Sequence, residues 1–387
     1  MIKIKFKNSN LRIKNVLRKN FNSDFVFDNF LQTEFRKIIL PLYLLQCLTL
    51  APKFSIRYDL LTSNSCRTKL IIATSAVLIF VKYNYDIILF SRILRDNLNA
   101  MYFFLVSLQI WSFFAVFIVN CLLTVLKSEI SAYLIIRLQR IHSSYKFVKM
   151  EVKCAMVINW ILFFSILLYH IIVFILRMII FKDPFSFTAL THLFVLVADC
   201  NNIYIARVLT LVKRAIILWI QEYEEILNMS NTETEDEVRC SHLAKLAHTY
   251  HELIAVGRMC QSVFGIPIAC LVFTTFVQAM SNVQTLIEEP IWNFNFVFAL
   301  TWNLRNILSV TVISLECENI YIWMKNIRVT CIMAEEVDAS SDAEVSGVAG
   351  GGEAGGEALA GGAALPVRLL TTVATYAVVL LQIKFLS

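Results

Sequence analysis

Long apolar runs, each followed by a short polar or charged segment, set the pattern of this sequence. The clearest runs cover residues 101–126, 155–176 and 259–287. A helix that crosses the hydrocarbon core of a bilayer needs about 20 mainly apolar residues. Each of these runs therefore predicts a transmembrane helix.

Four weaker runs also predict crossings: 70–91, 185–206, 291–315 and 369–383. The charged residues in the first three are Lys82, Asp86, Asp199 and Arg305. A charge is compatible with a crossing when its side chain faces the interior of a bundle or reaches an interface. The last run is short, but the flanking Arg368 and Lys384 can reach the two interfaces. The expected fold is therefore all-α, a polytopic membrane protein with seven transmembrane helices.

An eighth apolar segment, residues 38–52, predicts a different element. It contains Pro41 and ends at Pro52, and it is short for a crossing. We expect a short interfacial or re-entrant helix there, within a cytoplasmic amino-terminal segment that covers residues 1–68.

Basic residues indicate the orientation of the helices. Residues 1–37 hold nine Lys and Arg, whereas 127–153 and 207–258 hold six each. The intervening segments 92–100 and 288–290 hold two and none. Because positive charge favours the cytoplasmic side, the amino terminus is expected inside and residues after the seventh crossing outside. This orientation is opposite to that of a G-protein-coupled receptor.

The composition agrees with a membrane protein and argues against nucleic acid as a partner. Hydrophobic residues make up 58% of the chain and charged residues only 17%. The net charge of +6 comes from residues that flank apolar runs, so it predicts topology and not nucleic-acid binding. The ten cysteines form no C-x-x-C pair, so neither a zinc site nor a disulfide framework is indicated.

The cytoplasmic segments divide the rest of the chain. We expect a six-helix transmembrane bundle over 69–315, with helical extensions at 207–258 that form a cytosolic stalk. A cytoplasmic linker follows over 316–368. Its part 343–365 is rich in Gly and Ala, which predicts either a flexible loop or translated non-coding sequence.

Enzyme chemistry is not indicated. His251 and Glu252 begin like a zinc-protease H-E-x-x-H motif, but position 255 is alanine, so the second ligand is missing. No phosphate-binding loop or nucleophile motif is found, and no cofactor is expected.

Polar and aromatic residues gather in the halves of the helices that this orientation places outside. Aromatic walls with a few polar groups are typical of small-molecule pockets. The main candidates for ligand contact are Trp111, Tyr169, His170, Gln278, Trp302 and Asn303, with Tyr102, Gln109, His192 and Trp292 in the same group. The alternative for each is helix packing or an interfacial aromatic belt. Arg305 either has a partner in the bundle or reaches an interface.

The last apolar run carries the most specific pattern. Thr375 and Tyr376 are followed by five apolar residues and Gln382, in "TYAVVLLQ". With the seven predicted crossings and the cytoplasmic amino terminus, this pattern resembles the insect gustatory receptors, whose last crossing has Thr-Tyr, five hydrophobic residues and Gln-Phe. Ile383 stands where that family has phenylalanine. The segments "LYLLQCLTLAPKF" and "HELIAVGRMCQSVFGIPI" are more loosely similar.

The resemblance implies a tetrameric ligand-gated cation channel in the plasma membrane of chemosensory neurons. The last crossing, within 369–387, would line the pore, and the earlier crossings would bind a small-molecule tastant. The stalk would hold a homo- or hetero-tetramer together. The implied pore or gate residues are Thr375, Tyr376, Val379, Gln382 and Ile383. The alternative for Gln382 is a place at the outer interface next to Lys384.

Two other functions stay open. One is an odorant-receptor-like chemosensory channel, which shares the same layout. The other is a seven-span receptor or transporter without its own pore. A transporter is expected to show internal repeats and broken helices near the midplane, and the sequence has no such repeat.

Overall fold

A computed structural model describes residues 29–57, 59–95, 100–144, 149–181, 185–227, 233–288 and 294–339. Over these residues the fold is all-α, as the hydrophobic pattern predicts. The helices are α2 (Thr33–Leu48), α3 (Cys66–Arg95), α4 (Ala100–Leu126), α5 (Ser128–Ser144), α6 (Lys149–Phe181), α7 (Phe185–Leu227), α8 (Glu233–Glu288) and α9 (Phe294–Ala339).

Four of these helices are long and apolar enough to cross a membrane. The qualifying parts are Ser107–Leu126 of α4, Glu151–Ile179 of α6, Lys245–Val283 of α8 and Leu300–Ile327 of α9. They contain or overlap four of the predicted crossings, and they indicate a multi-pass membrane protein. The predicted crossings at 70–91 and 185–206 lie on α3 and α7, which do not belong to these four, and 369–383 lies outside the described residues.

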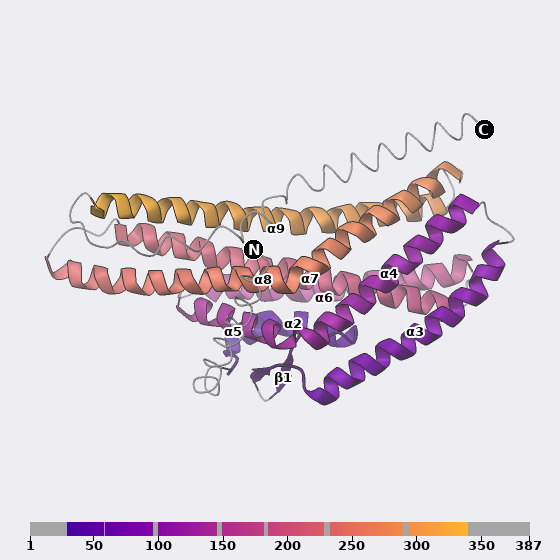
Figure 1. Cartoon of the computed structure of the whole chain (residues 1–387), viewed down its shortest axis with the longest axis horizontal. Coiled ribbons are helices and arrows are strands. Elements are labelled where there is room, and N and C mark those ends of the chain that lie inside the picture. Colours follow the sequence, from indigo (N-terminus) through magenta and orange to yellow (C-terminus); the bar gives the residue numbers. More distant parts are fainter. Residues whose placement is uncertain are drawn as a thin grey trace, which may run out of the picture.

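The longest helices run side by side and extend past the others. Helices α7, α8 and α9 have 43, 56 and 46 residues. Figure 1 shows the end of α7, the start of α8 and the end of α9 reaching together beyond the rest of the bundle, on the left. Lys213 of α7 pairs with Glu316 of α9 at 2.7 Å, which ties two of these helices together. The predicted cytosolic stalk, residues 207–258, covers the end of α7 and the start of α8, whereas the end of α9 lies in the predicted linker 316–368.

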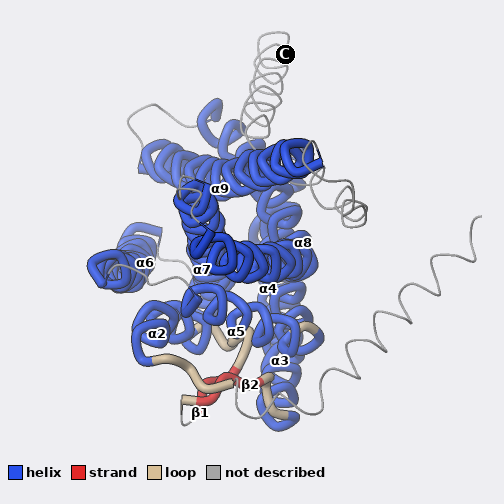
Figure 2. The backbone as a smooth tube through the Cα atoms, turned by 90° about the vertical axis from the view of Figure 1, so that its left-hand side faces the viewer, coloured by secondary structure: helices blue, strands red, loops and turns tan. Residues whose placement is uncertain are grey.

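The segment around 38–52 folds as a helix that ends in a tight turn. In α2, Ile39 and Leu42 are fully buried, and the helix packs against α6 and α7. Leu50 has a positive φ of 56°, and the chain then enters a short hairpin of β1 (Ser55–Arg57) and β2 (Leu60–Thr62). In Figure 2 the hairpin lies at the lower edge, and α6 is set to one side beside α2 and α7.

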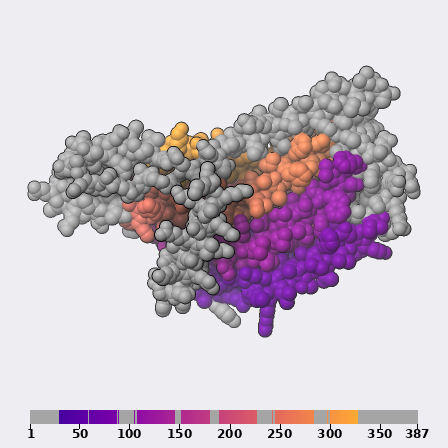
Figure 3. Space-filling model, in the orientation of Figure 1, coloured from indigo at the N-terminus to yellow at the C-terminus, as the bar shows by residue number. Residues whose placement is uncertain are grey.

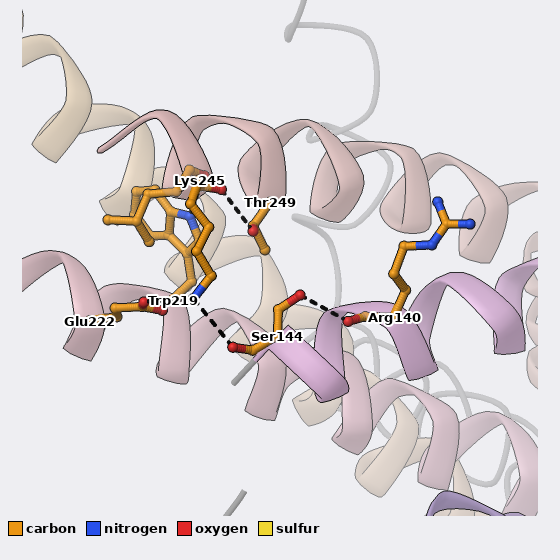
Figure 4. A network of polar contacts seen from close by, with 7 residues as sticks. Arg140, Ser144, Trp219, Glu222, Lys245 and Thr249 are labelled. Carbon is orange, nitrogen blue, oxygen red and sulfur yellow. Dashed lines mark hydrogen bonds and ion pairs between the residues drawn. The ribbon is translucent and has the colours of Figure 1, made fainter. Parts of the chain in front are cut away.

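A polar junction joins the end of α5 to α7 and α8 (Figure 4). The Lys245 ammonium donates to the carbonyl oxygen of Ser144 at 3.3 Å and to the carboxylate of Glu222 at 3.2 Å. The Trp219 indole N–H donates to the carbonyl oxygen of Leu246 at 2.9 Å. These contacts hold the end of α5 against the last turns of α7 and the first part of α8.

Large apolar side chains remain exposed along several helices. Figure 3 shows α3, α4 and part of α8 on one face of the molecule. Exposed residues include Leu70, Leu78 and Val81 of α3, Ile161, Leu168 and Ile179 of α6, and Leu304 and Leu308 of α9. Exposed apolar surface on this scale is typical of contact with lipid or with another protein.

Candidate ligand-binding site

A cavity of about 60 Å³ lies between α4, α6, α7, α8 and α9. Its apolar lining consists of Phe113, Val195 and Trp302. Its polar lining consists of Gln109, Arg177, Thr191, His192, Gln278 and Asn282. Five helices therefore contribute to one space with both apolar and hydrogen-bonding walls, a combination that small-molecule sites share, but its volume is well below the roughly 300–1,000 Å³ of such sites.

An aromatic cluster supports the apolar wall. Phe113 is buried, and its neighbour Phe114 packs against Phe194 of α7 with ring centroids 5.7 Å apart. Phe194 also meets Tyr83 of α3 edge to face at 4.7 Å. Such contacts fix the relative rotation of α3, α4 and α7, and so they hold the wall in place.

Two amide pairs join α8 to α9 at the cavity. The Asn306 side chain donates to the Gln278 side-chain oxygen at 2.9 Å, and Asn282 donates to Asn303 at 3.0 Å. Gln278 and Asn282 are four residues apart and therefore lie on one face of α8. Hydrogen bonds between helices satisfy polar groups that hydrocarbon would leave unpaired, so these pairs both hold the helices and orient the lining.

His192 is the unusual member of the lining. It is only 7% exposed, yet neither of its ring nitrogens has a hydrogen-bond partner. Its ring lies edge-on to Phe174 at 5.7 Å and to His170 at 6.4 Å. Most buried polar atoms in proteins have a partner, so His192 is an exception, but both of its nitrogens are inaccessible to water and neither is offered to the cavity.

A buried charged network lies directly behind the lining. Asp199 of α7 is hydrogen-bonded to His170 of α6 at 2.8 Å and forms an ion pair with Arg305 of α9. The Arg305 guanidinium lies over the ring of Trp302 at 4.8 Å and over the ring of Tyr169 at 5.7 Å. The indole of Trp302 therefore has the cavity next to it and a cation over its ring.

The sequence-predicted ligand residues fall into three groups. Gln278 and Trp302 line the cavity, as do Gln109 and His192. Tyr169, His170 and Asn303 do not line it, but each contacts a lining residue or Arg305. Trp111 lies off the lining, is 42% exposed and packs against Phe114.

Other predicted residues have no described position. Trp292 lies outside the described residues, as do the pore candidates Thr375, Tyr376, Val379, Gln382 and Ile383. Tyr102 belongs to α4, but its side chain is not described.

Several lining residues were not predicted from the sequence, although the pattern around some of them could have indicated them. Thr191 is adjacent to His192, and Asn282 follows Gln278 by one helical turn. Asp199 and Arg305 lie behind the lining and were singled out as charges within apolar runs; opposite charges in two such runs are a signal for a pair. Arg177, Phe113 and Val195 had no local signal, because their place depends on how the helices pack.

Metal chemistry has no support in the described part of the chain, where no three His, Cys, Asp or Glu side chains gather as a metal site would require.

Neither a protein-family model nor a characterised protein was found to match this sequence.

Proposed function

We propose that this protein is a chemosensory receptor similar to the insect gustatory receptors, in which a small-molecule tastant opens a cation channel. The cavity between α4, α6, α7, α8 and α9 is the observation that supports the proposal most directly. It combines apolar walls with oriented polar groups, and the resemblance in "TYAVVLLQ" supplies the family.

The position of the cavity agrees with the proposed topology. With the amino terminus inside, α4, α7 and α9 start on the outer side, whereas α6 and α8 end there. Gln109, His192 and Trp302 lie in the first halves of their predicted crossings, and Arg177 and Gln278 lie late in, or just after, theirs. All five thus belong to the outer side, where a tastant arrives.

Helices α3 and α7 complete the proposed bundle. Leu70, Leu78 and Val81 of α3 are at least 60% exposed, which suits a helix against lipid. The charge of α7 at Asp199 is buried and paired, so it does not prevent a crossing. With residues 369–383 these helices give seven crossings.

In the proposed receptor four subunits surround a pore that is lined by residues 369–383. Thr375, Tyr376, Val379, Gln382 and Ile383 would form the pore or gate. The cytosolic parts of α7, α8 and α9 would hold the homo- or hetero-tetramer together in the plasma membrane.

The proposal is tested by recording currents from cells that express the full chain while a panel of tastants is applied. We expect ligand-evoked cation currents. Replacing Trp302 with alanine should raise the half-maximal ligand concentration roughly tenfold or more, since aromatic anchors in desolvated pockets contribute strongly to binding.

The matched control is Trp111→Ala, because Trp111 is half-exposed and lies off the lining. It should leave the half-maximal concentration nearly unchanged at equal surface expression. Responses that occur only when a separate channel is co-expressed would instead support a seven-span receptor without its own pore.

A further inference from the structure

An exposed apolar stripe runs along α9, on a face that no other described helix covers. Leu304, Leu308, Thr311 and Leu315 follow one another at intervals of four, three and four residues, so they lie on one face of the helix. Leu304 and Leu308 are 68% and 61% exposed, and Leu315 is also exposed. The Thr311 hydroxyl donates to the carbonyl oxygen of Ile307 at 2.8 Å, so it needs no partner outside the helix. The stripe therefore suits contact with lipid or with another apolar helix.

Glu318 continues the stripe and makes lipid alone a poor cover for it. It follows Leu315 by three residues, within the apolar part Leu300–Ile327 of α9, and it is partly exposed. It forms no hydrogen bond or ion pair with the described part of the chain. A carboxylate beside hydrocarbon is unfavourable without a partner. The expected cover is therefore an apolar helix with a basic residue at the level of Glu318.

The last apolar run, residues 369–383, has a matching face. Leu370, Ala374, Ala377 and Leu381 repeat the spacing of four, three and four residues. In the proposed orientation this run passes from inside to outside and α9 passes from outside to inside, so the two would lie antiparallel. The two alanines on this face would allow the backbones of two helices to come close.

One antiparallel register brings these two faces together along their whole length. It places Ala377 opposite Leu308, and both helices then advance by about 1.5 Å per residue in opposite directions. The other facing pairs are Leu381 with Leu304, Ala374 with Thr311, and Leu370 with Leu315. The same register puts Arg368 at the level of Glu318, where its guanidinium would supply the missing partner.

This packing is compatible with the proposed pore. With about 3.6 residues per turn, none of the five proposed pore residues within 375–383 lies on the helix face that holds Ala374 and Ala377. One face of the run can therefore rest on α9 while the other faces line a pore.

The linker is long enough for the run to return to α9 of its own chain. From Glu318 to its end at Ala339, α9 extends about 32 Å. Residues 340–367 connect Ala339 to Arg368 and can span up to about 90 Å when extended. A tethered helix also has a high effective concentration near its own α9, which favours the same subunit over a neighbouring one.

We infer that residues 369–383 dock antiparallel on the α9 stripe of Leu304, Leu308, Thr311 and Leu315 in the same subunit, with Arg368 paired to Glu318. The inference rests on the proposed orientation of the crossings and not on ion conduction. Since α9 also carries Trp302 at the cavity, the docked run would share a helix with the ligand site.

Cross-linking of the full chain in cell membranes tests the contact. Leu308→Cys is combined with Ala377→Cys, a protease site is inserted after Gly352, and a short bifunctional thiol reagent is applied before cleavage. The fragments should stay joined roughly tenfold more often than in the matched control, Leu308→Cys with Val379→Cys. Val379 lies on the far side of the run from Ala377 and Leu381. The single-cysteine variants measure the background from native cysteines.

Each other result of this experiment has a definite meaning. Equal joining in the two double variants, or joining in neither, would overturn the inference. A product with the mass of two chains before cleavage would place the run on a neighbouring subunit and overturn docking within one subunit. Joining without ligand-evoked current would leave the docking standing and count against the proposed channel, whereas current without joining would do the reverse.

Charge reversal tests the pair of Arg368 with Glu318. Glu318→Lys would place two cations at one level, so it should reduce joining of the Leu308→Cys and Ala377→Cys fragments roughly fivefold or more. Adding Arg368→Glu should restore the joining. Glu34→Lys, on the exposed side of α2, makes the same change of charge elsewhere and should have no effect. Undiminished joining in Glu318→Lys would overturn the pairing.

Discussion

At the scale of single residues, Asp199 and Arg305 form a buried ion pair that joins α7 to α9. Their side chains are 8% and 16% exposed, and Arg305 also lies over Tyr169 and Trp302. A buried charge pair adds little net stability by itself, but removing one partner leaves an unpaired buried charge. The pair therefore works as a constraint on how α7 and α9 face each other.

Replacing Asp199 with asparagine should destabilise the protein by about 3–5 kcal/mol, because the Arg305 charge loses its partner. Thermal unfolding followed by tryptophan fluorescence in detergent should show a clearly lower midpoint. The double variant Asp199→Asn with Arg305→Gln should recover part of this loss.

Glu34→Gln is the matched control, since Glu34 and Lys37 form an exposed pair on α2 at 3.1 Å. Its effect should stay below about 1 kcal/mol. An equally small effect of Asp199→Asn would show that the buried pair does not constrain the fold.

Some members of this site could be predicted from the sequence, but their arrangement could not. Charges in apolar runs are conspicuous, so Asp199 and Arg305 could be singled out without a structure. Their pairing depends on which turns of α7 and α9 face each other, and Trp302 lines the cavity whereas Trp111 does not for the same reason. Helix rotation is a property of packing over several helices, and no local pattern encodes it.

At the scale of elements, the hydrophobic pattern predicts the existence of helices better than their ends. The apolar runs within α7, α8 and α9 are continuous with less apolar helical segments, so each run belongs to a helix of more than 40 residues. Pro267 lies inside α8 and does not end it. The β1–β2 hairpin was not predicted, since its strands have three residues each, and its turn places Asp59 at a φ of 63°.

The contact of α5 with α2 makes a prediction about acid stability. His142 of α5 is 7% exposed, with its ring 5.3 Å from that of Phe35 on α2. Burial, with a smaller effect of the nearby Arg214, lowers the pKa of His142 from 6.5 to about 3. Between those two values the unfolded chain binds a proton that the folded protein does not.

Stability should therefore be unaffected by His142 above pH 6.5 and decrease as the pH falls from 6.5 toward 3, by up to about 1.4 kcal/mol per pH unit. His142→Gln should reduce this decrease, as measured by thermal unfolding at pH 7.5, 5.5 and 4.5. His248→Gln, on an exposed part of α8, should keep it. Parallel profiles for the parent and His142→Gln would contradict a buried neutral imidazole.

At the scale of the whole molecule, the bundle has two different ends. One end holds the cavity, with Gln109, His192 and Trp302 gathered from the starts of three helices. The other end holds the joined extensions of α7, α8 and α9 (Figure 1). Ion pairs such as Lys213 with Glu316 and Arg137 with Glu252 lie on the helices that form these extensions or adjoin them. With the amino terminus inside, as we propose, the cavity end would face outside and the extended end would face the cytosol, which suits a receptor that takes its ligand from outside the cell.

The orientation of α7 and α8 decides whether this arrangement holds in a cell, and it can be measured without reference to the last apolar run. An epitope inserted after Asp183, before α7, should be reached by antibody on intact cells. An epitope inserted after Ser230, between α7 and α8, should be reached only after permeabilisation, because the six Lys and Arg of residues 207–258 hold that segment inside. The reverse pattern would place the cavity in the cytosol, exclude an external tastant as its ligand, and favour the orientation of a G-protein-coupled receptor.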